Sequence, residues 1–233
     1  MAFSDTVMRP LKLRSLVSRG VLVPLNFTLG TSAAIVRTVP LLLVDLVTDD
    51  GVTGHAYAFC YRPSGARAIA AHLAEAFDLL ASRPVTPYDA ARSLSRQFAL
   101  LGVTGTVRMA LSLFDMALWD ALARSRGMPL AALLGSQPRA LQAYDSRGLG
   151  LMEPDRLSKE ADALLASGLK AVKLRLGYPS AKEDISALKA VRRVVGDAVV
   201  QSGAYDGGSD RPRTTTRERG DLLARGTDPP RGL

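Results

Sequence analysis

The sequence predicts an α+β domain followed by the start of a parallel β/α domain. Three observations lead to this order of elements. Residues 11–60 read as strands, residues 67–124 carry helical periodicity, and from Ala140 onward strands and helices alternate. Repeated β/α units imply parallel strands joined by right-handed crossovers.

Three strands are expected in the first sixty residues. Residues 11–14 alternate between apolar and polar side chains, residues 38–47 are apolar and β-rich, and residues 52–59 follow the turn at Asp50-Gly51. Aspartate and glycine between two apolar runs indicate a hairpin, because glycine accepts the positive φ that the turn requires. Between the first two strands, residues 26–32 are small and polar and are expected to form a loop.

Helices are expected next, over residues 67–81, 88–100 and 106–124, because apolar side chains recur there at helical spacing. The third of these segments is apolar on most of its sides. Such a helix is expected to be buried on most faces. Gly127 and Pro129 end it.

The alternating segment begins with an expected strand at residues 141–146. A helix starts at Pro154, since proline suits the first helical turn, and a second strand follows at residues 170–176. Ser180 and Glu183 then have the spacing of a capping box, which opens a second helix. That helix ends at a glycine, and a third strand follows it.

Residues 202–233 break this pattern. They are mostly Gly, Asp, Arg, Thr and Pro without periodicity, so they cannot bury enough apolar surface to offset the entropy of ordering. We expect a disordered and non-native tail. The abrupt change within a strand suggests a frameshift in a GC-rich gene as a hypothesis, and a natural low-complexity tail is the alternative.

Composition favours a soluble, cytoplasmic protein. The 233 residues are 47% hydrophobic and 22% charged, as is ordinary for a globular chain. A single cysteine, Cys60, excludes an internal disulfide framework, and no apolar run approaches the roughly 18 residues that a membrane helix needs. The net charge of +8 is spread along the helices rather than clustered, so neither a membrane nor a nucleic acid is the expected partner, and an Arg-rich nucleic-acid binder is left as a third, weaker alternative.

The expected strand at residues 170–176 carries the clearest chemical signal. The two-residue period of a strand puts Val172 and Leu174 on one face and Lys173 and Arg175 on the other. In a parallel barrel the second face is the lumen, where two cations are costly unless they meet a substrate anion or carboxylate ligands. An edge strand with a solvated basic face would give the same pattern, and the residues alone leave both possibilities open.

Many short stretches match one known enzyme family, in order, over residues 10–200. They are Val23-Pro24-Leu25, Asp50-Gly51-Val52-Thr53-Gly54-His55, Phe59-Cys60-Tyr61, Gly105-Thr106-Val107-Arg108-Met109-Ala110, Asp115-Met116-Ala117-Leu118-Trp119-Asp120, Leu133-Leu134-Gly135, Gln142-Ala143-Tyr144-Asp145-Ser146, Lys170-Ala171-Val172-Lys173, Gly177-Tyr178-Pro179 and Val195-Gly196-Asp197. The sequence thereby resembles the mandelate racemase/muconate lactonizing enzyme family of the enolase superfamily.

The resemblance implies an enolase-like fold, in which an α+β capping domain is followed by a modified (β/α) barrel of eight units. Residues 1–135 match the capping domain, and residues 136–201 match the start of the barrel, about two of its eight units. The chain is therefore expected to be truncated after the second unit, with residues 202–233 as the tail. Members of the family also form homo-oligomers.

The chemistry that the resemblance implies is removal of the proton from the carbon beside a carboxylate. The enediolate that forms must be stabilised by a divalent metal, Mg²⁺ in this family, and by donors to the carboxylate. The implied reactions are racemisation or epimerisation by an isomerase, or dehydration by a lyase. The implied substrate is a small 2-hydroxy acid.

The family takes its metal ligands from barrel strands three to five and a His–Asp base pair from strands six and seven. In direct register Ala204 stands at the first ligand position, and Asp206 comes two residues late. No metal ligand is therefore assigned. We expect that the chain does not bind Mg²⁺ and is inactive alone. The alternative is a non-catalytic cap fragment that associates with an intact relative.

Two cations are the catalytic candidates. The family has a Lys-x-Lys pair on the second barrel strand. Lys173 matches the first lysine, near the substrate carboxylate, and Arg175 replaces the second, which acts as base. A guanidinium stays protonated at any working pH, so Arg175 is a poor base and a better electrostatic clamp. Dehydration or another one-base reaction is thus favoured over two-base racemisation.

Five residues are substrate-binding candidates by the same resemblance. Ser146 matches a position near the substrate carboxylate, with a turn-capping serine as the alternative. The other four match the loop and strand that close over the substrate as an apolar pocket: Leu29, Val36, Phe59 and Tyr61. For Val36 and Phe59 the alternative is a place in the core of the capping domain.

Overall fold

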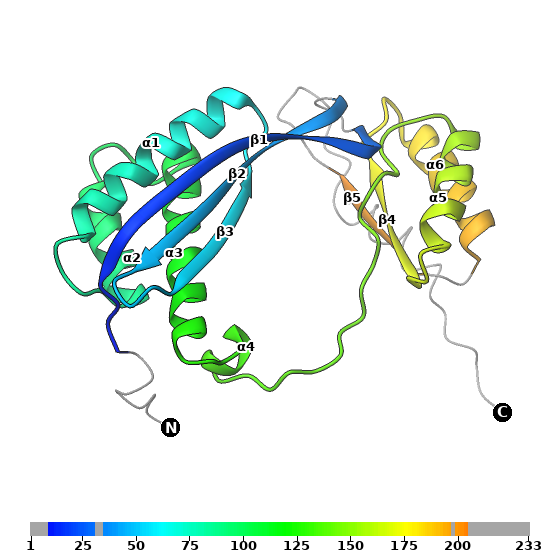
Figure 1. Cartoon of the computed structure of the whole chain (residues 1–233). Coiled ribbons are helices and arrows are strands. Elements are labelled where there is room, and N and C mark those ends of the chain that lie inside the picture. Colours follow the sequence, from blue (N-terminus) through cyan, green and yellow to red (C-terminus); the bar gives the residue numbers. More distant parts are fainter. Residues whose placement is uncertain (1–8, 31–34, 197–198, 205–233) are drawn as a thin grey trace.

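The computed structural model describes residues 9–30, 35–196 and 199–204. They form a three-stranded sheet with helices and a smaller β/α part, which are joined by a long segment without regular structure (Figure 1). Residues 205–233, most of the expected tail, lie outside the described residues. No helix in the described part of the chain is long and apolar enough to cross a membrane.

The first part of the chain forms an antiparallel sheet of β1 (Leu13–Gly30), β2 (Ile35–Thr48) and β3 (Thr53–Phe59), in that order. The expected hairpin joins β2 and β3. Gly51 has a φ of 83°, and its N–H donates to the Thr48 carbonyl at 3.0 Å. One face of β2 is buried in the core, through Leu42, Val44 and Leu46.

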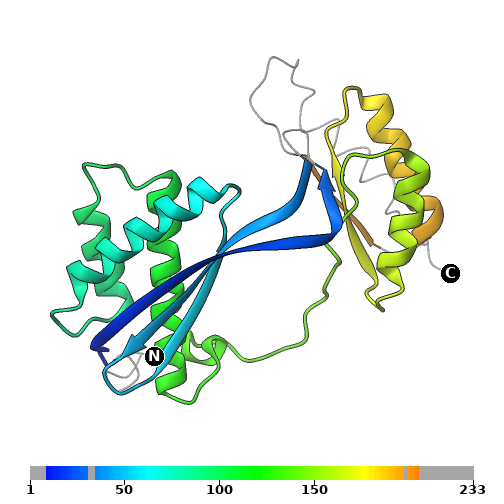
Figure 2. The ribbon, with the colours of Figure 1, turned by 45° about the horizontal axis from the view of Figure 1, so that its top comes forward.

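The prediction of a loop at residues 26–32 is wrong for residues 26–30, because β1 continues through them. After a register irregularity that follows Pro24, Leu29 pairs with Val36 across the two strands. Residues 31 and 32 lie outside the described residues. The difference arises from tertiary structure, which no pattern within residues 26–32 encodes. The β1–β2 pair continues past the end of β3 as an arm that reaches the β/α part (Figure 2). Cross-strand pairing of Leu29 and Gly30 extends the strand there.

Helices cover one face of the sheet. The three expected helices are confirmed as α1 (Pro63–Leu80), α2 (Pro87–Gln97) and α3 (Gly105–Ser125), and a short α4 (Leu130–Leu133) follows. The central helix, α3, packs closely on β3. A Cβ at Gly54 would lie 2.0 Å from the Ala117 carbonyl oxygen, so this contact requires a glycine.

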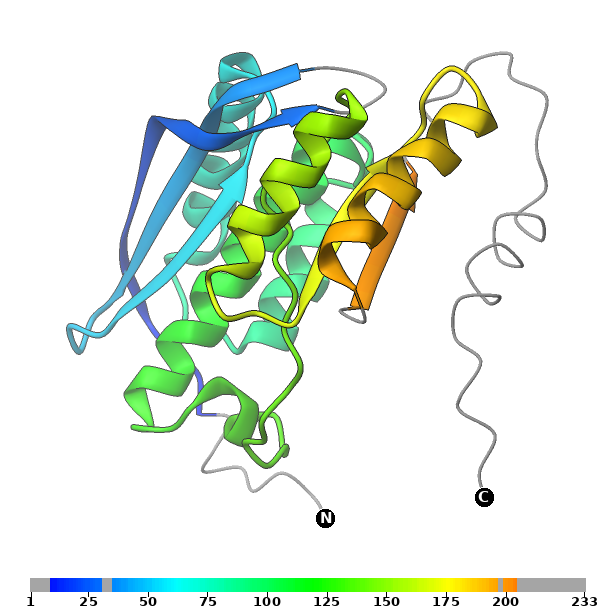
Figure 3. The same ribbon diagram turned by 90° about the vertical axis from the view of Figure 1, so that its right-hand side faces the viewer.

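The β/α part contains α5 (Pro154–Leu165), β4 (Ala171–Leu176), α6 (Ala181–Val195) and β5 (Val199–Ala204). The strands β4 and β5 are parallel, as expected, and α5 and α6 lie side by side against them (Figure 3). β5 continues to Ala204, three residues into the segment expected to be part of the tail.

The capping box of α6 is confirmed. The Ser180 hydroxyl accepts from the Glu183 N–H at 3.3 Å, and the Glu183 carboxylate accepts from the Ser180 N–H at 2.8 Å. The two residues thus satisfy backbone donors that the first helical turn cannot pair itself.

The strand expected at residues 141–146 is wrong in its extent, because the chain forms only one parallel bridge there, between Asp145 and Val172. The backbone N–H and carbonyl of Asp145 each form a hydrogen bond of 2.8 Å with the region of β4. Directly afterwards the chain turns away. The Arg147 N–H donates to the Asp145 carboxylate at 2.9 Å, and this local bond competes with continued strand pairing.

The two faces of β4 are arranged as predicted. Val172 and Leu174 are fully buried and pack among apolar residues of α5 and α6. Lys173 and Arg175 alternate with them and are half-buried. A shift of one residue would exchange the two faces, so the predicted register is confirmed.

Candidate active site

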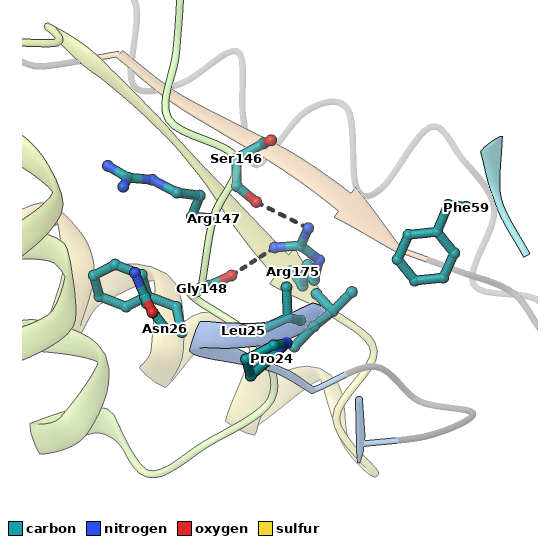
Figure 4. A pocket seen from close by; sticks show the side chains of 10 residues that line it. Pro24, Leu25, Asn26, Phe59, Ser146, Arg147, Gly148 and Arg175 are labelled. Carbon is teal, nitrogen blue, oxygen red and sulfur yellow. Dashed lines mark hydrogen bonds between the residues drawn. The ribbon is translucent and has the colours of Figure 1, made fainter. Parts of the chain in front are cut away.

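A cavity of about 360 Å³ opens where the β1 arm meets the β/α part. Its lining side chains come from β1, from the end of β3, from the loop after Asp145 and from β4 (Figure 4). The lining residues are Pro24, Leu25, Asn26, Phe27, Leu29, Phe59, Ser146, Arg147, Gly148 and Arg175.

The guanidinium of Arg175 lies in the middle of this cavity (Figure 4). Its Nη1 donates to the Gly148 carbonyl at 2.5 Å, and its Nη2 donates to the Ser146 carbonyl at 3.0 Å. Burial lowers the pKa of Arg175, and the charge of Glu160 opposes this shift. No carboxylate among the described residues forms an ion pair with Arg175. The guanidinium therefore keeps donors available for an anion.

The loop that holds Arg175 is itself fixed by a carboxylate on α5. Gly148 and Leu149 have φ values of 57° and 43°, in the left-handed region. A leucine rarely adopts this conformation. Leu149 is fully buried, and its N–H donates to Glu160 at 2.6 Å, so packing and a charged acceptor together maintain the turn. A Cβ at Gly148 would overlap the Glu160 carboxylate.

Sequence reasoning missed an ion pair beside the cavity. Asp145 is 3% exposed, and Arg147 donates to its carboxylate through Nε at 3.0 and 3.1 Å and through Nη2 at 2.5 Å. These hydrogen bonds lower the pKa of Asp145. The Arg147 guanidinium also lies 5.5 Å from the centre of the Phe27 ring. An acid two positions before an arginine, at the end of an expected strand, was the signal that could have found this pair.

The cavity brings together four of the seven predicted site residues: Leu29, Phe59, Ser146 and Arg175. The other three do not line it. Lys173 is half-buried on the same strand as Arg175, and Val36 pairs with Leu29 across the arm. Tyr61 is 75% exposed, and the centre of its ring lies 4.7 Å from that of Phe59.

The exposure of Val36 and Phe59 decides against their alternative role in the core of the capping domain. Val36 and Phe59 are only half-buried and are not among the core residues of the capping domain. Ser146 contributes its backbone carbonyl to Arg175. Cys60 is 4% exposed, and burial raises the pKa of its thiol. We therefore expect this thiol to react slowly.

The described residues do not fit a magnesium site. No group of three His, Cys, Asp or Glu side chains within them could hold a metal ion. Asp145, the acid next to the cavity, is engaged by Arg147. Ala204 pairs with Leu176 at the end of β5, and Asp206 lies outside the described residues. What the cavity offers a ligand is the charge and the hydrogen-bond donors of its own side chains.

A capping domain of strands and helices, followed by parallel β/α units with a cation-lined cavity between them, defines a member of the enolase superfamily. Residues 15–135 match the N-terminal domain of mandelate racemase / muconate lactonizing enzyme. The chain belongs to this family.

Curated relatives include dehydratases and epimerases. The chain is 33% identical over 161 residues to the L-talarate/galactarate dehydratase of Salmonella typhimurium, a match that covers 68% of this chain and 40% of the relative. It is 41% identical over 100 residues to a hydrophobic dipeptide epimerase of Roseobacter litoralis, over 43% of this chain and 28% of the relative. The chain thus spans less than half the length of these relatives.

Solved structures share the fold. An enolase from the alphaproteobacterium bal199, solved with bound Mg, has a TM-score of 0.80 at 33% identity, over 93% of this chain and 59% of that chain. An enolase from Bradyrhizobium, complexed with magnesium and mandelic acid, has a TM-score of 0.75 at 29% identity, over 84% of this chain and 54% of that chain.

Proposed function

We propose that this chain carries the carboxylate-binding side of an enzyme site that removes the α-proton of a small 2-hydroxy acid. The observation that carries the proposal is the position of Arg175. Its guanidinium lies in the middle of a largely apolar cavity, is oriented by two backbone carbonyls, and has no carboxylate partner among the described residues. A substrate carboxylate would supply the missing negative charge.

Arg175 would act electrostatically within the cavity, and the family resemblance gives Lys173, which does not line the cavity, a role of the same kind. The proton beside a carboxylate leaves with difficulty, because negative charge builds up on the carboxylate oxygens as it departs. Fixed cations next to those oxygens stabilise the charge at the moment it forms. A guanidinium donates two parallel hydrogen bonds to a carboxylate and does not release a proton, so Arg175 would orient the substrate and would not act as the base.

This division of roles favours dehydration or another one-base reaction over two-base racemisation. In a one-base reaction a single group removes the proton, from the face of the substrate opposite Arg175. The relatives include both dehydratases and an epimerase, so the family is compatible with either outcome.

We further propose that the chain does not catalyse the reaction by itself. In solved relatives Mg is bound, and there a divalent cation would polarise the substrate carboxylate. The described residues hold neither a metal-ligand group nor a histidine in the cavity lining. Binding of a carboxylate and turnover of a substrate should therefore be separable in this chain.

Titration of the purified chain with a 2-hydroxy acid such as mandelate or lactate, followed by ligand-observed NMR, tests the proposal. We expect saturable binding without Mg²⁺ and no α-proton exchange in D₂O. Arg175→Gln should weaken binding about 10- to 100-fold, since charge-assisted hydrogen bonds contribute roughly 1.5–3 kcal/mol. Arg156→Gln, at an exposed position on α5, is the matched control. Measurable exchange, or binding unaffected by Arg175→Gln, would contradict the proposal.

A non-catalytic role as a cap fragment that associates with an intact relative is the second candidate. It is favoured by the outer face of the sheet, away from α1 and α3, where large apolar side chains are exposed. These are Val17 at 41%, Val21 at 36%, Leu43 at 39% and Tyr57 at 67%. Size-exclusion chromatography of the chain mixed with the Salmonella dehydratase distinguishes the two candidates, because only this one predicts a mixed complex that Leu43→Glu abolishes.

A further inference from the structure

We infer that Arg147 determines specificity at this site, by selecting substrates that carry a second carboxylate, so that 2-hydroxy dicarboxylates bind in preference to monocarboxylates. This inference rests on the proposed function, because it takes the first carboxylate to be held at Arg175.

The cavity has two chemically different ends (Figure 4). Phe59 lies at one end, Arg147 and Asn26 lie at the other, and Arg175 lies between them. When one carboxylate of a substrate is bound at Arg175, the rest of the substrate can extend toward either end of the cavity. One direction leads to an aromatic ring, and the other leads to a guanidinium and a carboxamide, which recognise a polar or anionic group.

Arg147 is held in place and still has donors to offer. Its ion pair with Asp145 uses Nε and one N–H of Nη2, and no described residue accepts a hydrogen bond from Nη1. The side chain is 57% exposed, whereas the Asp145 side chain that anchors it is 3% exposed. The buried Asp145 carboxylate fixes one edge of the Arg147 guanidinium, and the centre of the Phe27 ring lies 5.5 Å from it. Together they orient the edge that carries Nη1 before a ligand binds. Such pre-organisation lowers the entropic cost of binding an anion.

The balance of charge also suits a dianion. Asp145 and Arg147 offset each other, so the pair adds little net charge to the cavity wall. Arg175, within the cavity, forms no ion pair with any described carboxylate, and neither does Lys173, which shares its face of β4 but does not line the cavity. The unpaired charge of Arg175 leaves the cavity wall positive overall, which favours a dianion over a monoanion.

The experiment compares acids that differ only in the second charge. Galactarate and galactonate differ by a terminal carboxylate in place of a hydroxymethyl group, and 2-hydroxyglutarate and 2-hydroxypentanoate differ by a carboxylate in place of a methyl group. Each is titrated into the full chain at pH 7 and followed by ligand-observed NMR. We expect at least one dicarboxylate to bind about tenfold more tightly than its partner, the strength of one charge-assisted hydrogen bond.

Three variants assign the preference to Arg147. Arg147→Gln should remove most of the tenfold preference, and Arg147→Lys should retain part of it. Because Arg147→Gln leaves a buried Asp145 without its partner, the double variant Asp145→Asn/Arg147→Gln repeats the test without that charge. Arg156→Gln is the control that should change neither affinity. Circular dichroism establishes that each variant keeps the helical content of the parent chain.

The outcomes separate this inference from the proposed function. Equal binding of both members of each pair, with binding still dependent on Arg175, overturns the role of Arg147 alone. The same follows if the preference persists in the double variant. Binding of neither acid overturns the proposed function, and the inference falls with it.

Discussion

The backbones of Gly30 and Gly150 are in direct contact. A Cβ on Gly150 would lie 2.4 Å from the Gly30 nitrogen, and the N–H of the next residue, Leu151, donates to the Gly30 carbonyl at 3.2 Å. Gly30 ends the β1 arm, and Gly150 follows the loop that holds Arg175. This contact therefore joins the two walls of the cavity.

Substituting Gly150→Ala should detach the arm from the β/α part. The new methyl group has no room, because backbone atoms of Gly30 surround its position, so we expect a loss of about 1–3 kcal/mol in the free energy of unfolding. Urea titration followed by circular dichroism measures this loss. Gly20→Ala is the control, since nothing lies within 4 Å of a Cβ there, and it should change stability by less than about 0.5 kcal/mol. Equal effects of the two substitutions would show that the contact is not tight.

The capping box predicts a local effect on α6. Ser180→Ala removes the acceptor of the Glu183 N–H and should cost about 1 kcal/mol in thermal or urea unfolding. Ser136→Ala, an exposed serine outside any helix, should be neutral within about 0.5 kcal/mol. Adding Glu183→Ala to Ser180→Ala should cost less than the two single losses summed, because the two residues form one reciprocal unit. Strict additivity would contradict this pairing.

The ion pair of Asp145 and Arg147 predicts how stability depends on pH. Hydrogen bonds from Arg147 hold the pKa of Asp145 below its unfolded value of about 3.9. The stability that this pair contributes is then complete above roughly pH 5 and is lost as the pH falls through the lower, folded pKa. Urea unfolding of the parent and of Asp145→Asn should therefore differ at pH 7 and converge toward pH 3. Asp162→Asn, at an exposed position on α5, is the control for removal of a carboxylate outside this ion pair.

Cys60 predicts slow thiol chemistry. Its side chain is 4% exposed, and burial raises the pKa of the thiol, so a thiolate is scarce at neutral pH. A disulfide reagent should modify the native chain at least about 100-fold more slowly than the chain in 6 M guanidinium, if local opening costs roughly 3 kcal/mol or more. As the sequence has a single cysteine, the absorbance signal is unambiguous. A Cys60→Ala/Ser136→Cys variant, with an exposed thiol, should react at the unfolded rate.

Local chemistry explains which elements could be predicted. The Asp50-Gly51 turn, the Ser180–Glu183 capping box and the alternation of Val172 and Leu174 with Lys173 and Arg175 each depend on a few consecutive residues. The structure has all three where the sequence indicates them. Of the candidate site residues, Lys173 and Arg175 are the two that this alternation alone brings to notice, and Arg175 is the one of the two that lines the cavity.

Other features depended on partners that are distant in the sequence. Residues 26–30 have the small and polar composition of a loop, but pairing of Leu29 and Gly30 with β2 extends the strand through them. Residues 141–144 have the composition of a strand, but they have no strand pairing, and only Asp145 is bridged to β4. In both places the presence or absence of a neighbouring strand to pair with outweighs a weak local preference.

By itself, the sequence determined the order of the elements, the buried faces of the helices and strands, and the cationic face of β4, because periodicity and turn chemistry act within a few residues. The tertiary structure alone decided that the β1 arm crosses to the β/α part, that Phe27 lies under Arg147, and that Arg175 is oriented by the carbonyls of Ser146 and Gly148. These contacts join residues 27 or more positions apart, and no local pattern encodes which distant surfaces will meet.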